Sequence, residues 1–468
     1  MEDAAKNFEQ INIMGTADVK KLTLTMGLPM IISMALQAVY NIVDSYFVSC
    51  MPSTDGISNL SDLAVNALTL AFPVQMLMVA IGVGTGVGIN AILSRSLGEG
   101  DREKAGKIAG NSIFLGLCMF VLFLLFGFFG VNAYIKSQTS DPVIIEMGVS
   151  YLRICTVGSL GVSMYMTYEK LLQATGKTMQ STIAQISGAI TNIILDPIMI
   201  FGLCGCPQMG IEGAAYATVI GQFVSFILDA IFHHKYNSKE FSTSLKYIKP
   251  ELTIIGQIYR VGVPAIIMQA LMSFMTYGVN VIFALVSTEA VTAYGIYYKI
   301  QQFVFFAAFG MNNAMIPIIA FNYGRRNKKR INDGIKYGMI YTLIIMLAGA
   351  VLLQVLANPV LFVFTLSDKT RELCLIAVRI VTLGYLFVGA NIAFQGIFQA
   401  LGNGVSSLVL SIVRLTAVPL PLAYALTFVS NAESLIWISF PIGELCAFAV
   451  SLILMKRIRK QKIAPLKS

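Results

Sequence analysis

Long apolar segments follow one another along the chain and are separated by short polar turns. Each has about 20 residues or more, which is the length an α-helix needs to cross the hydrocarbon core of a bilayer. They predict twelve transmembrane helices, six in each half of the chain, at residues 22–49, 63–92, 106–134, 143–172, 179–201, 211–232, 253–286, 289–322, 331–356, 371–400, 405–428 and 435–455. Several exceed the minimum length, so we expect tilted or bent helices.

The two halves of the chain repeat each other. Residues 153–158 read RICTVG and residues 379–384 read RIVTLG, and the same offset pairs Gly98 with Gly324. An even number of helices in each half places both halves in the membrane in the same orientation, so the repeats are parallel. We therefore expect an all-α polytopic membrane protein with two six-helix lobes, related by a pseudo-two-fold axis along the membrane normal.

The basic residues support this helix count. Cytoplasmic loops of membrane proteins carry an excess of Lys and Arg. If the N-terminus and every second loop lie on one side, that side holds most of the 33 Lys and Arg residues, and the other holds only Lys136, Lys369 and Arg371. A miscount by one helix would remove this asymmetry. We expect a multi-pass protein of a bacterial-type cell membrane, with both termini in the cytoplasm.

These assignments divide the chain into five parts. We expect a cytoplasmic N-terminal tail, a first lobe, a cytoplasmic linker, a second lobe and a basic cytoplasmic tail, at residues 1–21, 22–232, 233–250, 251–456 and 457–468. The composition agrees with a membrane protein, because 56% of the residues are hydrophobic and only 12% are charged. The net charge of +9 comes without a nucleic-acid-binding motif, so we expect no nucleic acid partner. The sequence contains no Ser-His-Asp arrangement and no zinc motif, and we expect neither an enzyme nor a cofactor.

Among the acidic residues inside predicted membrane helices, Asp44 and Asp196 are the sharpest candidates for function. Ionisable groups at membrane depth are costly and usually face a cavity or a partner. Polar residues at helical spacing form three stripes in the first half of the chain. The first consists of Gln37, Tyr40, Asn41 and Asp44, the second of Gln185, Asn192 and Asp196, and the third of Thr218, Gln222, Ser225 and Asp229. The stripes can converge on a shared, partly hydrated pocket, or their amides and hydroxyls can form hydrogen bonds that link the helices.

The second half does not repeat this pair of acids. Near the repeat position of Asp44 it has Asn280, which ends a polar stripe of its own. Glu444 lies inside a predicted helix, but Arg379 and Arg414 lie in neighbouring elements, which favours a structural ion pair. We therefore expect an ion-coupling site in the first half.

Four glycines, Gly82, Gly84, Gly86 and Gly88, alternate inside the second predicted helix. A dinucleotide-binding loop would instead follow a β-strand and begin a helix. The alternation therefore indicates close helix packing or a flexible helix.

Several motifs resemble those of the multidrug and toxic compound extrusion (MATE) transporters. They are GLP at 27–29, YNIVD at 40–44, LGEGD at 97–101, LQATG at 172–176 and NIILDP at 192–197. Each motif alone is modest, but their order, spacing and repetition are specific in combination. Over almost its whole length the chain is similar to the DinF-like branch of this family, particularly its MepA-like members.

This resemblance implies an antiporter with a central cleft between two lobes, which exports organic cations or other amphipathic compounds in exchange for H+ or Na+. The ion site of the family's first lobe corresponds here to Asp44, Asn192, Asp196 and Thr218, which are also the candidate ligands for Na+. Burial disfavours the charged form of a carboxylate, so either acid can instead take up a proton. Both events remove the negative charge that would attract a cationic substrate.

We expect the exported molecule to contact polar and aromatic side chains of the predicted cleft, which are Gln37, Tyr40, Asn41, Gln185, Phe201, Tyr277 and Asn280. The expected partners are small organic cations or amphipathic drugs and the lipid bilayer, and we expect a monomer. A flippase for lipid-linked precursors, or an exporter of one metabolite from the same superfamily, is the alternative. Such flippases often have additional helices and a strongly basic cavity, whereas this chain has acids at membrane depth.

Overall fold

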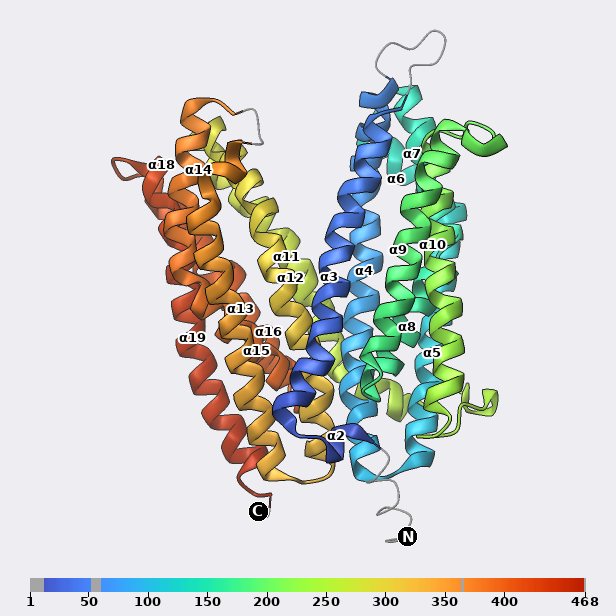
Figure 1. The fold of residues 1–468 in the computed structure, drawn as a ribbon. Helices are drawn as coiled ribbons and strands as arrows, with labels where there is room; N and C mark the ends of the chain where they lie inside the picture. The colour runs from blue at the N-terminus through green and yellow to red at the C-terminus, as the bar shows by residue number, and fades with distance from the viewer. Residues whose placement is uncertain (1–11, 52–59, 363–365, 467–468) are drawn as a thin grey trace. The chain divides into compact units, whose positions relative to one another are not determined.

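The computed structural model describes residues 12–51, 60–362 and 366–466, and helices dominate all three ranges (Figure 1). The chain forms two compact units. The N-terminal unit comprises Ala35–Leu93 and Asp101–Gln257, and the C-terminal unit comprises the chain up to Met34, Ser94–Gly100 and the chain from Ile258 onwards. Helices α3 and α4 therefore each contribute to both units.

The first half of the chain contains most of the N-terminal unit. Its elements are α2 (Ile13–Thr16), α3 (Val19–Ser49), α4 (Leu60–Glu99), α5 (Arg102–Leu125), η1 (Phe126–Gly130), α6 (Val131–Gln138), α7 (Pro142–Val157), α8 (Leu160–Ala174), α9 (Thr178–Phe201), η2 (Leu203–Gly205), α10 (Ile211–Phe232), η3 (His233–Asn237) and η4 (Leu245–Tyr247).

The second half of the chain belongs to the C-terminal unit almost entirely. Its elements are α11 (Leu252–Ala284), α12 (Thr288–Gly324), α13 (Lys328–Phe362), α14 (Asp368–Val381), η5 (Thr382–Gly384), α15 (Tyr385–Ala400), α16 (Gly404–Ile412), η6 (Val413–Ala417), α17 (Pro419–Leu426), α18 (Ala432–Leu435), η7 (Ile436–Ile438), α19 (Ser439–Ile458) and η8 (Arg459–Ile463).

The length and hydropathy of these helices confirm the predicted number of membrane spans. Within the described ranges, 11 helices are long and apolar enough to cross a membrane, and the number rises to 12 when α7 and α8 are counted as one broken span. These two helices meet at an angle of 44°. The sequence predicted one continuous helix at 143–172, and the structure corrects this to a helix that is broken at Gly158 and Ser159.

Short polar side chains begin several of the helices. The Asp101 side chain accepts a hydrogen bond from the backbone N–H of Lys104 at the start of α5. Ser287 and Ser367 do the same at the starts of α12 and α14. A side-chain oxygen at this position satisfies one of the backbone N–H groups that the first helical turn leaves unpaired.

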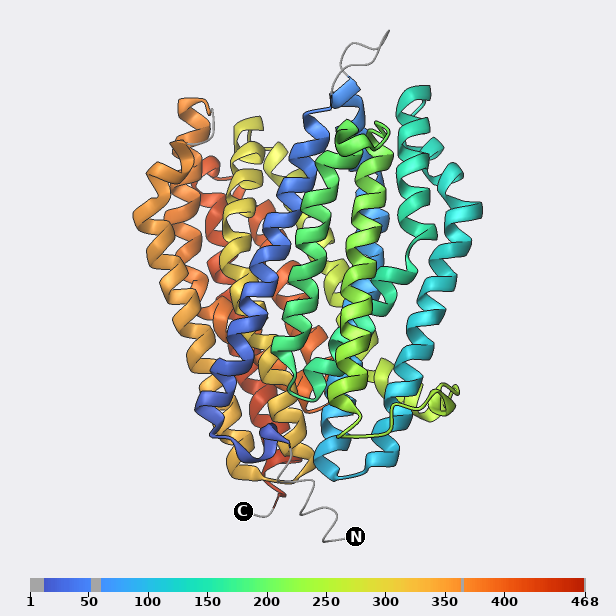
Figure 2. The same cartoon turned by 45° about the vertical axis from the view of Figure 1, so that its right-hand side comes forward.

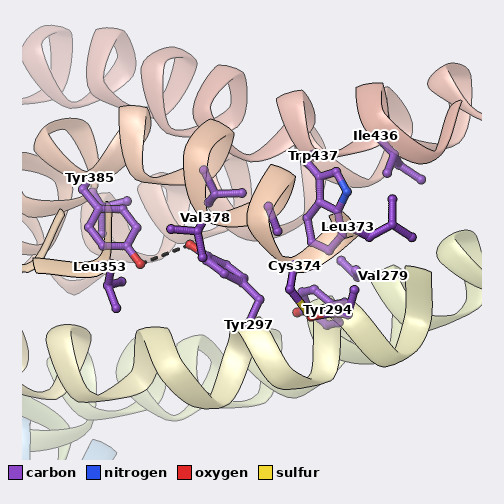
Figure 3. Close-up of a cluster of buried hydrophobic side chains, with 14 of the residues drawn as sticks. Val279, Tyr294, Tyr297, Leu353, Leu373, Cys374, Val378, Tyr385, Ile436 and Trp437 are labelled. Carbon is purple, nitrogen blue, oxygen red and sulfur yellow. Dashed lines mark hydrogen bonds between the residues drawn. The ribbon is translucent and has the colours of Figure 1, made fainter. Parts of the chain in front are cut away.

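Aromatic side chains fill the core of the C-terminal unit (Figure 3). The Phe283 and Trp437 rings pack edge to face with their centroids 4.9 Å apart. The hydroxyls of Tyr297 on α12 and Tyr385 on α15 are 3.1 Å apart and share a hydrogen bond. Burying these hydroxyls away from water is tolerable because they bond to each other.

Two of the alternating glycines in α4 receive side chains from α8. A Cβ atom at Gly82 would collide with the sulfur of Met166, and one at Gly86 would lie 2.7 Å from Cγ of Lys170. The prediction of close helix packing is therefore confirmed at these two positions. The absence of a side chain on α4 leaves the space that the aliphatic stem of Lys170 fills.

In the corresponding contact of the C-terminal unit, the glycine and the larger side chain have exchanged helices. The repeat partner of Gly86 is Asn312 on α12, and the repeat partner of Lys170 is Gly396 on α15. A Cβ atom at Gly396 would collide with Oδ1 of Asn312. Each half therefore pairs one glycine with one larger side chain, but the glycine lies on a different helix of the pair.

The ends of α4 and α12 cross with their backbones in direct contact. A Cβ atom at Gly98 would overlap the backbone carbonyl oxygen of Phe321, and one at Gly324 would overlap that of Arg95. Gly98 and Gly324 are repeat partners, as are Arg95 and Phe321. The contact is thus reciprocal, and only glycine fits on either side of it.

A short N-terminal segment is bound to the same region of the C-terminal unit. The Arg330 guanidinium donates hydrogen bonds to the carbonyls of Met14 and Ala17, at 2.9 and 2.7 Å. Arg325 donates to the carbonyl of Gly15 at 2.7 Å. These bonds satisfy backbone carbonyls at the end of α2 and hold the segment against the ends of α12 and α13.

We predict that Gly98→Ala and Gly324→Ala each destabilise the protein strongly. The added methyl group meets backbone atoms rather than a flexible side chain, so helix separation is the only relief, and overpacking of this kind costs about 1–3 kcal/mol or more. The measurements are the yield of monodisperse protein after solubilisation and its thermal stability in detergent. Gly295→Ala on α12 is the matched control, because a Cβ atom there meets nothing within 4 Å. Equal stability of Gly98→Ala and Gly295→Ala would contradict the packing argument.

Candidate functional site

Helices α9 and α10 lie side by side in the N-terminal unit (Figures 1 and 2). Two glycines allow this close approach. A Cβ atom at Gly188 would lie 2.5 Å from the carbonyl oxygen of Gly221, and one at Gly221 would lie 2.7 Å from that of Gly188. One turn beyond this contact, both helices carry polar side chains toward each other.

These polar side chains form a small buried cluster. Nδ2 of Asn192 donates hydrogen bonds to Oδ1 of Asp196, one turn later on α9, and to Oγ1 of Thr218 on α10, each at 3.3 Å. The exposed fractions are 2% for Asn192, 0% for Asp196 and 6% for Thr218. The structure thus brings together three of the four residues predicted to couple an ion.

The cluster brings several oxygen atoms together away from water. Oδ1 of Asn192 is buried and has no hydrogen-bond partner among the described residues. The N–H₂ group of the Asn192 amide is shared between an acid and a hydroxyl. A buried carboxylate beside an amide oxygen and a hydroxyl oxygen has the groups to accept a proton or to hold a monovalent cation.

The remaining predicted residues lie in several environments. Asp44 lies within helix α3, but its side chain and those of Tyr40 and Asn41 lie outside the described residues. Four of the predicted substrate-contact residues are half-buried, which are Gln37 on α3, Gln185 and Phe201 on α9, and Asn280 on α11. The Phe201 ring packs edge to face on Phe47 with a centroid distance of 6.4 Å. Tyr277 on α11 is 67% exposed. Their contact with a substrate is a prediction.

The C-terminal unit contains a buried ion pair where the N-terminal unit has Thr218. Nε of Arg414 lies 2.6 Å from Oε1 of Glu444, and Nδ2 of Asn391 donates to Oε2 of Glu444 at 2.8 Å. The two charged side chains are 5% and 12% exposed. The predicted structural ion pair is confirmed, with Arg414 as the partner, whereas Arg379 is exposed.

Sequence reasoning missed a second set of polar residues in the N-terminal unit. Nζ of Lys170 donates to Oε1 of Gln173 at 2.9 Å and lies 3.5 Å from Oε1 of Glu169, which also accepts from Nε2 of Gln173 at 2.6 Å. All three residues lie on α8. They stand at the end of the predicted helix 143–172, where charges normally reach water, but Lys170 is only 7% exposed.

A family model described as MatE matches residues 29–198 and 264–425, which is most of both halves. The chain belongs to the MATE family. Members of this family are membrane transporters rather than enzymes, and they need no cofactor. This MATE protein is accordingly a multi-pass membrane transporter.

Curated and solved relatives agree over nearly the whole length. The multidrug export protein MepA of Staphylococcus aureus is 26% identical over 447 residues, which cover 95% of each chain. A MATE protein crystallised in complex with MaL6 has a TM-score of 0.87 and 25% identity, covering 96% of this chain and 98% of that one.

A third relative has the same fold, but a different function has been suggested for it. A transporter of the MOP superfamily from Pyrococcus furiosus, described as having a binding pocket of reverse polarity that suggests a different function, has a TM-score of 0.86. It is 25% identical and covers 97% of this chain and 98% of that one. The shared architecture, two lobes with twelve helices, confirms the predicted fold class of this MATE transporter.

We predict that breaking the Arg414–Glu444 pair destabilises this MATE transporter far more than removing it. Arg414→Met or Glu444→Gln alone leaves a buried charge without its partner, which costs about 3–5 kcal/mol. The double variant removes both charges and should recover much of the loss. Thermal unfolding of the four proteins in detergent measures this difference. An additive double variant would show that the two side chains act independently.

Proposed function

We propose that this MATE protein is a secondary active multidrug efflux transporter, which exports cationic or amphipathic small molecules in antiport with H+ or Na+. The observation that carries this proposal is the buried cluster of Asn192, Asp196 and Thr218. A carboxylate enclosed by an amide and a hydroxyl can exchange a small cation, and such sites mark ion pathways in membrane proteins. The multidrug export protein of S. aureus, similar over 95% of both chains, supports the same class of transport.

Competition between the ion and the substrate provides the coupling. When Asp196 is ionised, the N-terminal unit carries a buried negative charge that attracts a cationic substrate. A proton on Asp196, or Na+ bound between Asp196, Asn192 and Thr218, cancels that charge. Binding of the ion then lowers the affinity for a cationic substrate. Because the substrate binds more tightly to the ion-free protein than to the ion-bound protein, binding of the ion and binding of the substrate alternate.

The side chain of Asp44 completes this proposal as a second carboxylate of the ion site. We assign substrate contact to the residues predicted for this role, which are Gln37, Tyr40, Asn41, Gln185, Phe201, Tyr277 and Asn280. We also place both termini and the linker 233–250 in the cytoplasm, because the excess of Lys and Arg lies on that side. The protein acts as a monomer in this account.

We predict that Asp196→Asn abolishes coupled transport while leaving membrane abundance unchanged. The amide has nearly the shape of the carboxylate but cannot take up a proton or balance the charge of Na+. Asp44→Asn should have the same effect. The measurements are drug susceptibility of cells that express each variant, dye efflux from those cells, and the amount of protein in their membranes.

Asp62→Asn is the matched control for both variants, because Asp62 is an exposed acid at the start of α4. It should retain the efflux of the wild type. Efflux at the rate of the wild type in Asp44→Asn or Asp196→Asn would refute the carboxylate mechanism.

We predict that reconstituted protein transports a cationic dye in response to one imposed ion gradient. Proteoliposomes are given first a pH gradient and then a Na+ gradient, and dye movement is recorded in each. Whichever gradient drives the dye identifies the coupling ion, and Asp196→Asn should remove the response. Transport of lipid-linked precursors or of one metabolite, with no response of any cationic dye, would favour the flippase or the specific exporter instead.

A further inference from the structure

Asp229 is a buried acid that is not part of the proposed ion site. It lies on α10 and is 0% exposed, and neither carboxylate oxygen has a hydrogen-bond partner among the described residues. An ionised carboxylate is costly to bury without hydrogen bonds or a paired cation. Some positive charge must therefore accompany Asp229, either from a side chain or from a bound cation.

The nearby charges leave Asp229 one positive charge short. Glu169 and Lys170 are charged neighbours of Asp229 on α8, the helix that packs against α10. The Lys170 ammonium is bonded to Gln173 and lies 3.5 Å from Glu169, which also accepts a hydrogen bond from Gln173. Glu169 thus has the hydrogen bond and the nearby ammonium that stabilise a carboxylate, whereas Asp229 has no hydrogen-bond partner among the described residues. One ammonium cannot neutralise two carboxylates.

The other groups around Asp229 do not supply the missing charge. Tyr165 on α8 also lies near Asp229 and Glu169, but a phenol is neutral. One turn beyond Asp229, Nδ1 of His233 is 3.0 Å from Nδ2 of Asn237. An amide N–H₂ can only donate, so Nδ1 accepts and the ring is not the doubly protonated cation. The stretch of α4 that packs on α8 (82–90) and the stretch of α9 that packs on α10 (178–188) contain no Asp, Glu, Lys, Arg or His.

We propose that Asp229 is a second proton-binding carboxylate of the N-terminal unit, which takes up and releases a proton beside the Glu169–Lys170 pair. A proton fits this place better than a metal cation. The Lys170 ammonium repels a metal ion, and no group of three or more His, Cys, Asp or Glu side chains suited to a metal occurs among the described residues. This proposal goes beyond the antiport function and holds for either coupling ion.

Asp229 is separate from the Asn192–Asp196–Thr218 cluster. Thr218 and Asp229 are eleven positions apart on α10, which corresponds to roughly 16 Å along an α-helix. Release of the proton would make Asp229 compete with Glu169 for the Lys170 ammonium. Because the stem of Lys170 packs on Gly86 of α4, a shift of this ammonium would change the contacts among α4, α8 and α10.

Infrared spectroscopy of the full-length protein tests for the proton directly. A protonated carboxyl group has a C=O band that is distinct from the bands of a carboxylate, and the band shifts in D₂O. We expect the titration of the wild type between acidic and alkaline pH to contain a band that Asp229→Asn removes. Asp229→Glu should shift this band rather than remove it, and Asp62→Asn should leave it in place. Asp196→Asn should also leave it in place, which separates this test from that of the ion site.

Stability at neutral pH distinguishes a proton site from a structural ion pair. If Asp229 carries a proton, Lys170→Met lowers the melting temperature by leaving Glu169 unpaired. Glu169→Gln should then rescue Lys170→Met, and Asp229→Asn should not. Asp229→Asn alone should melt close to the wild type.

Two results would overturn the proposal. The first is a carboxyl spectrum that is the same in the wild type and in Asp229→Asn at every pH. The second is rescue of Lys170→Met by Asp229→Asn together with a lowered melting temperature of Asp229→Asn alone, because these would show an ionised Asp229 permanently paired with Lys170. If Asp229→Asn does not fold, the band position in Asp229→Glu decides the question.

Discussion

Direct backbone contact between α4 and α12 is the constraint on which the C-terminal unit depends. In lipid, helices gain little by burying apolar side chains against each other, so their association relies on closely approaching backbones. Gly98 and Gly324 each admit the backbone of the other helix. Because they are repeat partners, one ancestral glycine is enough to explain both sides of the contact. The crossing also attaches the last turns of α4 to a unit that is formed mainly by the second half of the chain, together with the chain up to Met34.

Much of the fold could be predicted because membrane spans are set by the length of apolar runs. Twelve such runs and their internal repeat were sufficient for the helix count and the two-lobe architecture. The break between α7 and α8 could not be located in the same way. Gly158 and Ser159 interrupt the helix, whereas Gly161 three residues later is helical, and the local sequence does not distinguish them. Tertiary packing decides which small residue becomes the bend.

The candidate site could be predicted only as far as helical spacing reaches. Asn192, Asp196 and Thr218 lie on facing sides of neighbouring helices, so their stripes pointed to one place. Helical spacing does not predict which side chains pair between distant segments, because that pairing depends on side-chain rotamers and on the rotation of each helix. Spacing did not show that Glu444 pairs with Arg414 rather than Arg379, or that Asp229 is buried without a hydrogen-bond partner among the described residues.

The opposite placement of glycine in the two halves has an evolutionary consequence. Gly86 accommodates Lys170 in one repeat, and Gly396 accommodates Asn312 in the other. Copying a single residue from one repeat to its counterpart would create a collision or a void, so two coordinated replacements are needed to pass between these arrangements. Divergence at this pair is therefore hard to reverse. A consensus sequence averaged over the two repeats could therefore combine two large side chains, or two glycines, at this contact.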